Sequence, residues 1–109
     1  MKKIWLFLFS LFAANSLADD IAFGTVKGIK VYDQSDGKVT KIVFSADATH
    51  QNEGCNGVAT LRHSLRSEEA LNQMLSIALA AYMAQKKIRA YSNDGTCEAD
   101  LLALQNSRF

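Results

Sequence analysis

The chain has 109 residues, 49% of them hydrophobic and 21% charged, and a formal net charge of +1 at pH 7. This length fits one small domain and leaves no room for a second of ordinary size. The net charge is near zero and the charged residues form no basic cluster in the sequence. This argues against binding to nucleic acid or to an anionic membrane surface through a basic field.

Residues 1–18 have the pattern of a cleavable signal peptide. Lys2 and Lys3 supply the positive start, Ile4–Phe12 is apolar but for one serine, and Ser16–Ala18 places small residues where a signal peptidase reads the chain. The apolar run is shorter than the roughly 20 residues that span a bilayer. The residue after the expected cleavage site is Asp19 rather than a lipid-carrying cysteine, so we expect no membrane span after cleavage.

Cleavage before Asp19 leaves a single mature domain, residues 19–109, with 91 of the 109 residues. Lys2 and Lys3 leave with the signal, so ten Lys and Arg face eleven Asp and Glu and the net charge becomes −1. We therefore expect an exported protein, periplasmic or secreted, that does not bind nucleic acid.

Cys55 and Cys97 are the only cysteines. An exported chain meets an oxidising compartment, and two cysteines allow only one intramolecular pairing, so we expect a disulfide. A redox pair is usually spaced C-x-x-C, and a zinc site needs more ligands than His50 and His63 supply. We expect no metal and no cofactor.

Phe23–Asp33 alternates apolar with small or charged residues, which predicts a strand exposed on one face. Gly24 and Gly28 lie inside it. Interior glycines often mark bulges or sharp bends, so we expect the strand to curve there.

Ser35–Gly37 contains the Asp-Gly pair typical of a tight hairpin turn. Val39–Ala46 is predicted to be the second strand and to pair with the first. Within it, Ile42 and Phe44 are the expected core residues.

Asp47–Gly57 is polar and rich in Asn and Gly, and it is the loop best suited to binding. Val58–Leu65 alternates again and predicts a third strand, with His63 on the same face as its leucines.

Ser67 followed by Glu68 and Glu69 predicts the start of a helix that ends near Gln85. Its expected packing side carries Leu71, Met74, Leu75, Ala78, Leu79 and Tyr82.

The sixteen residues from Ala70 to Gln85 carry no charge, on either side of the helix. A solvated helix face normally shows Lys and Glu, so a second surface, and most simply another copy of the chain, is expected to cover it. The alternative is an alanine-rich helix with a mildly hydrophobic exposed side.

Ile88–Ser92 predicts a fourth strand, Asn93–Gly95 a turn, and Ala99–Ser107 the last strand, with Leu101 and Ala103 on one face and Leu102 and Leu104 on the other. The expected order is strand, strand, strand, helix, strand, strand. This order predicts an α+β fold, a small OB-like antiparallel β-barrel with one helix and one disulfide.

Four features carry a more specific likeness: Cys55 before the third strand, Leu75–Tyr82 in the helix, Lys87–Tyr91 after it, and Cys97 beyond that strand. They resemble the B subunits of pertussis-like and subtilase-type A-B toxins, and small exported proteins built like them. The resemblance implies a ring of subunits with the helices around its centre, and surface pockets that bind sugars of host glycans. Those subunits are usually longer and often carry a further disulfide, and none of their sugar-contacting residues can be matched here.

No motif of a serine hydrolase, a phosphate loop or a dinucleotide site occurs, so we expect no catalytic residues. His50 lies in a polar loop with Asp47 and Glu53, a combination that could hold a metal or act as a base, but such loops collect these residues by chance. His63 has no visible partner and fits a partly buried core histidine.

Tyr32 and Tyr91 are the aromatic residues to test first in a sugar pocket, because a ring face can stack on a pyranose; packing on the barrel surface is the alternative for each. The expected function is a non-catalytic binding module that self-associates through its helix and recognises a glycan or another extracellular ligand. The alternatives are a periplasmic structural or inhibitor-type protein that binds a protein partner through the helix or the loop Asp47–Gly57, and a small enzyme using His50 or His63.

Overall fold

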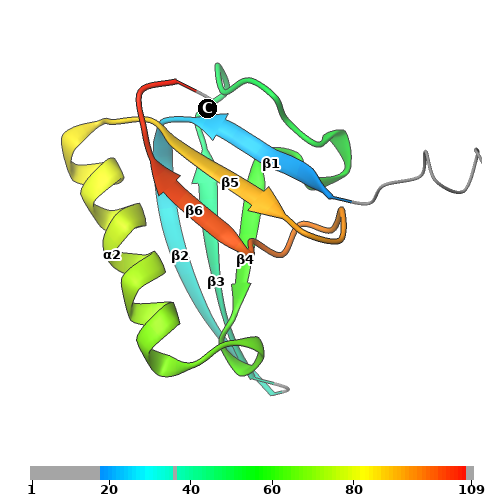
Figure 1. Cartoon of the computed structure of the whole chain (residues 1–109). Helices are drawn as coiled ribbons and strands as arrows, with labels where there is room; N and C mark the ends of the chain where they lie inside the picture. The colour runs from blue at the N-terminus through cyan, green and yellow to red at the C-terminus, as the bar shows by residue number, and fades with distance from the viewer. Residues whose placement is uncertain (1–17, 36, 108–109) are drawn as a thin grey trace, which may run out of the picture.

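The computed structural model describes residues 18–35 and 37–107, which form two three-stranded antiparallel sheets and one long helix (Figure 1). One sheet has the order β1-β5-β6, from Asp19–Gly24, Ile88–Ser92 and Leu101–Leu104. The other has the order β2-β3-β4, from Val26–Gln34, Gly37–Phe44 and Val58–Arg62. The helix α2 spans Glu68–Ala84, and two short 3-10 helices, η1 and η2, span Glu53–Cys55 and His63–Leu65.

The α+β class with one helix and one disulfide is confirmed. Strand pairing does not close the two sheets into a barrel within the described residues. Two isolated bridges, Phe23 with Thr49 and Thr60 with Glu98, connect each sheet to a loop that follows or precedes a strand of the other. The predicted signal peptide lies outside the described residues except for Ala18, and β1 begins at the next residue.

The predicted strand Phe23–Asp33 is in fact two strands from different sheets, separated at Thr25. The chain crosses between sheets at Gly24, where an added Cβ would lie 2.7 Å from the Cβ of Ala48. The acidic residues at the start of β1 do not fit the alternating pattern from which strands are predicted. Asp20 is nevertheless buried, with 3% exposed, and its Oδ1 accepts a hydrogen bond of 2.8 Å from Arg89 Nε on β5. Gly28 lies at the predicted bulge, where the β2–β3 register shifts.

The hairpin of β2 and β3 is confirmed, with partners running from Val26 and Phe44 to Gln34 and Gly37. Ile42 and Phe44 belong to the buried core, as predicted.

The third predicted strand is too long: β4 ends at Arg62, and residues 63–65 form η2 instead. The last pair with β3 joins Arg62 to Val39. Beyond η2, Arg66 Nη2 forms an ion pair with Glu98 Oε2 at 2.7 Å, which ties this part of the chain to the segment before β6. This tertiary contact has no signature in the alternating pattern.

Both ends of the helix lie where predicted. At its start, Ser67 Oγ accepts a hydrogen bond from the Ala70 amide, and at its C-terminal end Gln85 adopts a left-handed conformation. Its packing side is rotated from the prediction. Leu71, Ala78 and Ala81 are buried, whereas Leu79 and Tyr82 are 51% and 41% exposed.

Two small residues explain this rotation. Ala78 and Ala81 have no exposed surface, and α2 contacts both β2 and β6 (Figure 1). Short side chains allow a helix to approach a sheet closely, so the packing side follows the alanines and the large Leu79 and Tyr82 turn outward.

The strand β5 is confirmed at its predicted bounds, and the last strand is shorter than predicted, with only Leu101–Leu104 paired. Leu102 is buried, while Leu101 and Leu104 are both exposed.

Cys55 and Cys97 form the predicted disulfide, 42 residues apart in sequence. Closing a loop of this length stabilises a domain by about 4 kcal/mol on the chain-entropy model. No helix in the described part of the chain is long and apolar enough to cross a membrane.

The two glycines near the sheet crossing offer a matched test of the fold. Gly24→Ala is expected to lower the free energy of unfolding by about 1–3 kcal/mol, because the new methyl group would overlap Ala48. Gly28→Ala, with nothing within 4 Å of its added Cβ, is expected to change it by less than about 0.5 kcal/mol. Urea unfolding of both variants measures the difference, and equal stability of the two would contradict the close contact.

Candidate functional site

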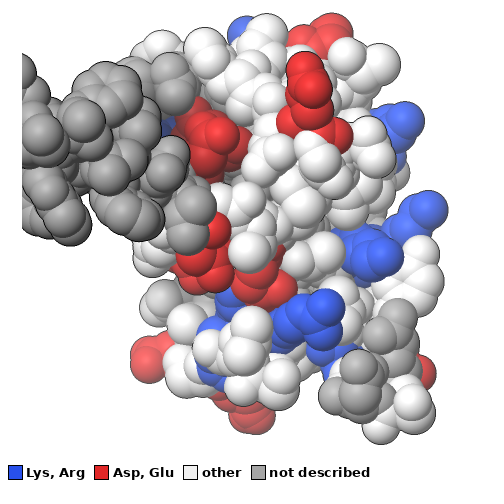
Figure 2. All heavy atoms as spheres, turned by 90° about the vertical axis from the view of Figure 1, so that its right-hand side faces the viewer, with Lys and Arg blue, Asp and Glu red and all other residues white. Residues whose placement is uncertain are grey.

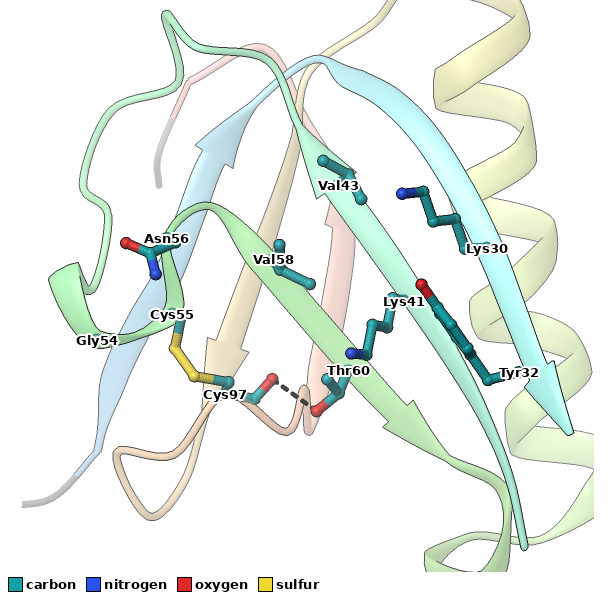
Figure 3. Close-up of a pocket in the computed structure, with 10 residues that line it drawn as sticks. All are labelled: Lys30, Tyr32, Lys41, Val43, Gly54, Cys55, Asn56, Val58, Thr60 and Cys97. Carbon is teal, nitrogen blue, oxygen red and sulfur yellow. Dashed lines mark hydrogen bonds between the residues drawn. A yellow bond between two sulfur atoms is a disulfide. The ribbon is translucent and has the colours of Figure 1, made fainter. Parts of the chain in front are cut away.

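A hollow of about 400 Å³ lies on the face of the β2-β3-β4 sheet (Figure 3). Six of its lining residues come from the three strands, namely Lys30, Tyr32, Lys41, Val43, Val58 and Thr60. They share a face because side chains alternate along a strand and paired residues of antiparallel strands point the same way.

The strand register places these residues in rows. Lys30 is the direct partner of Lys41, Lys41 the partner of Thr60, and Val43 the partner of Val58. The hollow thus has a polar row across all three strands, with its two cations on β2 and β3, and an apolar pair on β3 and β4 beside it.

The other side of the hollow is formed by η1 and the disulfide, through Gly54, Cys55, Asn56 and Cys97. Asn56 ends η1 in a left-handed conformation. Thr60 donates a 3.0 Å hydrogen bond from its Oγ1 to the Cys97 carbonyl, so the disulfide is anchored to β4 next to the hollow (Figure 3).

Lys41 and Tyr32 are in contact, with the ammonium nitrogen 4.9 Å from the ring centroid. Neither Lys30 nor Lys41 forms an ion pair with any described residue. The hollow therefore contains an aromatic ring and two positive charges that the described chain does not neutralise.

Charge is distributed unevenly over the molecule. Figure 2 shows Lys and Arg along the right-hand border and lower middle of one face, and Asp and Glu mostly on its upper and left parts. A net charge near zero thus conceals local fields of either sign.

The structure separates the two tyrosines that the sequence singled out. Tyr32 lines the hollow and is 38% exposed. Tyr91 lies on β5 in the other sheet, with its ring centroid 4.9 Å from Arg89 Cζ. The two rings therefore cannot belong to one site on the same sheet.

The two histidines lie apart from the hollow. His50 is exposed in the loop after β3. His63 lies in η2, where its Nε2 forms a 2.8 Å hydrogen bond with the buried Thr40 Oγ1, so it has the partner that the sequence did not reveal. Among the described residues, no group of three or more His, Cys, Asp or Glu is placed to hold a metal ion.

Sequence reasoning missed Lys30 and Lys41, although the signal was present. The Asp-Gly turn predicts a hairpin, and pairing Gln34 with Gly37 across it makes Lys30 the partner of Lys41. Extending the register from the turn, rather than examining each strand alone, would have found the lysine pair.

A second hollow is lined in part by Arg62, Asp94 and Glu98. Its Glu98 is engaged in contacts that stabilise the fold. Glu98 accepts hydrogen bonds from the Arg62 amide at 2.7 Å and from Thr60 Oγ1 at 3.1 Å, besides its ion pair with Arg66. These contacts fasten the chain before β6 to β4 and η2.

Searches against protein-family models, curated proteins and solved structures find no match to this chain.

The loop before Cys97 contains Asp94, a carboxyl with a lowered pKa. Hydrogen bonds from the Thr96 and Ser92 hydroxyls and from the Thr96 amide lower the pKa of the Asp94 carboxyl below 3.8. We expect an NMR titration of Asp94 to give a midpoint below that value, and Thr96→Val to raise it.

The lowered pKa of Asp94 makes the free energy of unfolding depend on pH. A folded pKa below the unfolded one adds stability that is present above the unfolded pKa and is lost as the pH falls through the folded pKa. An Asp94 midpoint unchanged by Thr96→Val would contradict the role of the Thr96 hydroxyl.

Proposed function

We propose that this protein is an exported, non-catalytic binding module that recognises a saccharide in the hollow beside Tyr32. The observation that carries this proposal is the hollow itself, of about 400 Å³, which falls in the usual range for small-molecule sites of roughly 300–1,000 Å³. It combines an aromatic ring, apolar side chains and hydrogen-bonding groups, the combination that suits a ligand with one apolar and one hydroxylated face.

The contact of Lys41 with Tyr32 supports a stacking site. A cation over a ring face is a weak interaction at a partly exposed site, of about 0.5–1 kcal/mol. A pyranose could take the place of the ammonium on the ring, and the displaced Lys41 would then contact the sugar's oxygen atoms.

The arrangement of elements supports the proposal of an OB-like fold similar to the toxin B subunits. One bent segment, β1 and β2, contributes a strand to each sheet, and the helix lies between β4 and β5 in the chain. This order agrees with the expected one once the first predicted strand is divided in two.

The exposed side of α2 supports self-association. Leu79, Tyr82 and Met83 are 51%, 41% and 79% exposed, and no charged residue lies among them. Val31 on β2 and Leu104 on β6, the two strands that contact α2, are also exposed. Because the open sheet edges and the uncharged helix adjoin one another, we propose that a second copy of the chain covers them.

Tyr32→Ala is expected to abolish saccharide binding on a glycan array, or to weaken it by tenfold or more, because the stacking surface is lost. Tyr91→Ala is the matched control and should leave binding unchanged, since Tyr91 lies on the other sheet. Loss of binding in both variants alike would point to a different site, and no binding by the wild-type protein would contradict the proposed function.

Self-association is tested by sedimentation of the mature protein. We expect an oligomer that Met83→Glu dissociates, because the new carboxylate would be buried against another subunit. Ser64→Glu adds the same charge at an exposed position in η2 and should leave the oligomer intact. A wild-type monomer would contradict self-association and favour a separate protein partner for the helix.

A further inference from the structure

Lys30 and Lys41 form an unusual pair for a β-sheet. They are direct cross-strand partners on β2 and β3, and like charges placed opposite one another destabilise a sheet. No described carboxylate forms an ion pair with either of them. Selection for stability alone would not favour this arrangement.

Protection of a sheet edge does not explain both lysines. A lysine on an edge strand discourages pairing with other chains, and β2 is an edge strand, so this explanation suits Lys30. Lys41 lies on β3, the central strand, and is only partly exposed, so it protects no edge.

From this pair we infer that the hollow binds a negatively charged group, and that its ligand is a saccharide carrying a carboxylate or a sulfate. The inference rests on the proposed saccharide function and specifies its ligand class. An anion that contacts both ammonium groups would accept a charge-assisted hydrogen bond from each and offset the cost of placing like charges on paired strands.

The surroundings of the two lysines suit this role. In Figure 3 the Lys30 side chain extends toward Val43 and the Lys41 side chain toward Thr60, both across the same face of the sheet. The hydroxyl end of Tyr32 lies between them in this view and supplies a further donor. Val43 and Val58 form an apolar floor, which strengthens electrostatic attraction by keeping water from one side of the ligand.

The test compares three disaccharides by isothermal titration calorimetry with protein purified after expression of the full sequence. Lactose is neutral, the unsulfated chondroitin disaccharide carries a carboxylate, and the sulfated one carries a sulfate as well. We expect the charged disaccharides to bind at least tenfold more tightly than lactose, and their binding to weaken with added salt. The two charged probes distinguish a carboxylate ligand from a sulfate ligand.

Lys30→Gln and Lys41→Gln are each expected to weaken binding of the charged probes by about tenfold, as loss of a charged hydrogen bond does. Lys30→Arg and Lys41→Arg should retain most of the affinity. The matched control is Lys27→Gln, which removes the same charge from the same strand at an exposed position outside the hollow. Circular dichroism of each variant verifies that it is folded.

Two results would overturn the inference in different ways. If lactose or a neutral glycan binds as tightly as the charged probes and the lysine variants do not differ from wild type, the ligand class is wrong while the saccharide function stands. If no saccharide binds, both proposals fail.

Discussion

The covalent bond between Cys55 and Cys97 is the constraint on which the arrangement of the two sheets depends. It joins η1, which leads into β4, to the segment that leads into β6, so each sheet has a strand tied to the same point. The Thr60 amide donates to the Cys97 carbonyl at 2.8 Å, which fastens this point to β4 itself. A domain of this size buries a modest core, so about 4 kcal/mol from one cross-link is a large share of its stability.

The hollow is a consequence of the same constraint. Its strand side needs the β2–β3 register that aligns Lys30 with Lys41, and its other side needs η1 held against β4 by the disulfide. Gly24 permits the close passage of Ala48, so the loop after β3 can return across β1 toward η1. Residues far apart in the chain, from Lys30 to Cys97, are thus brought together around the hollow by strand pairing and the disulfide.

The helix connects the packing of the single chain with its proposed assembly. Ala78 and Ala81 allow α2 to lie close to the sheets, and this places Leu79, Tyr82 and Met83 outside. In a single chain these side chains are in contact with water, where exposed apolar area of this kind is unfavourable. The same small residues that stabilise the fold therefore create the surface that a second copy is proposed to cover.

The sequence alone determined the hairpin of β2 and β3, the helix from its Ser67 cap to Gln85 and the bounds of β5, because turn residues, capping side chains and side-chain alternation act over a few residues. It also determined the disulfide, because two cysteines allow only one pairing within the chain. Tertiary structure alone decided the rest. Asp20 is buried against Arg89 in a strand that begins with two acidic residues, Arg66 pairs with Glu98 beyond the early end of β4, and Ala78 and Ala81 lie on the side of α2 that packs. Each of these depends on residues far apart in the chain, so local pattern could not reveal them.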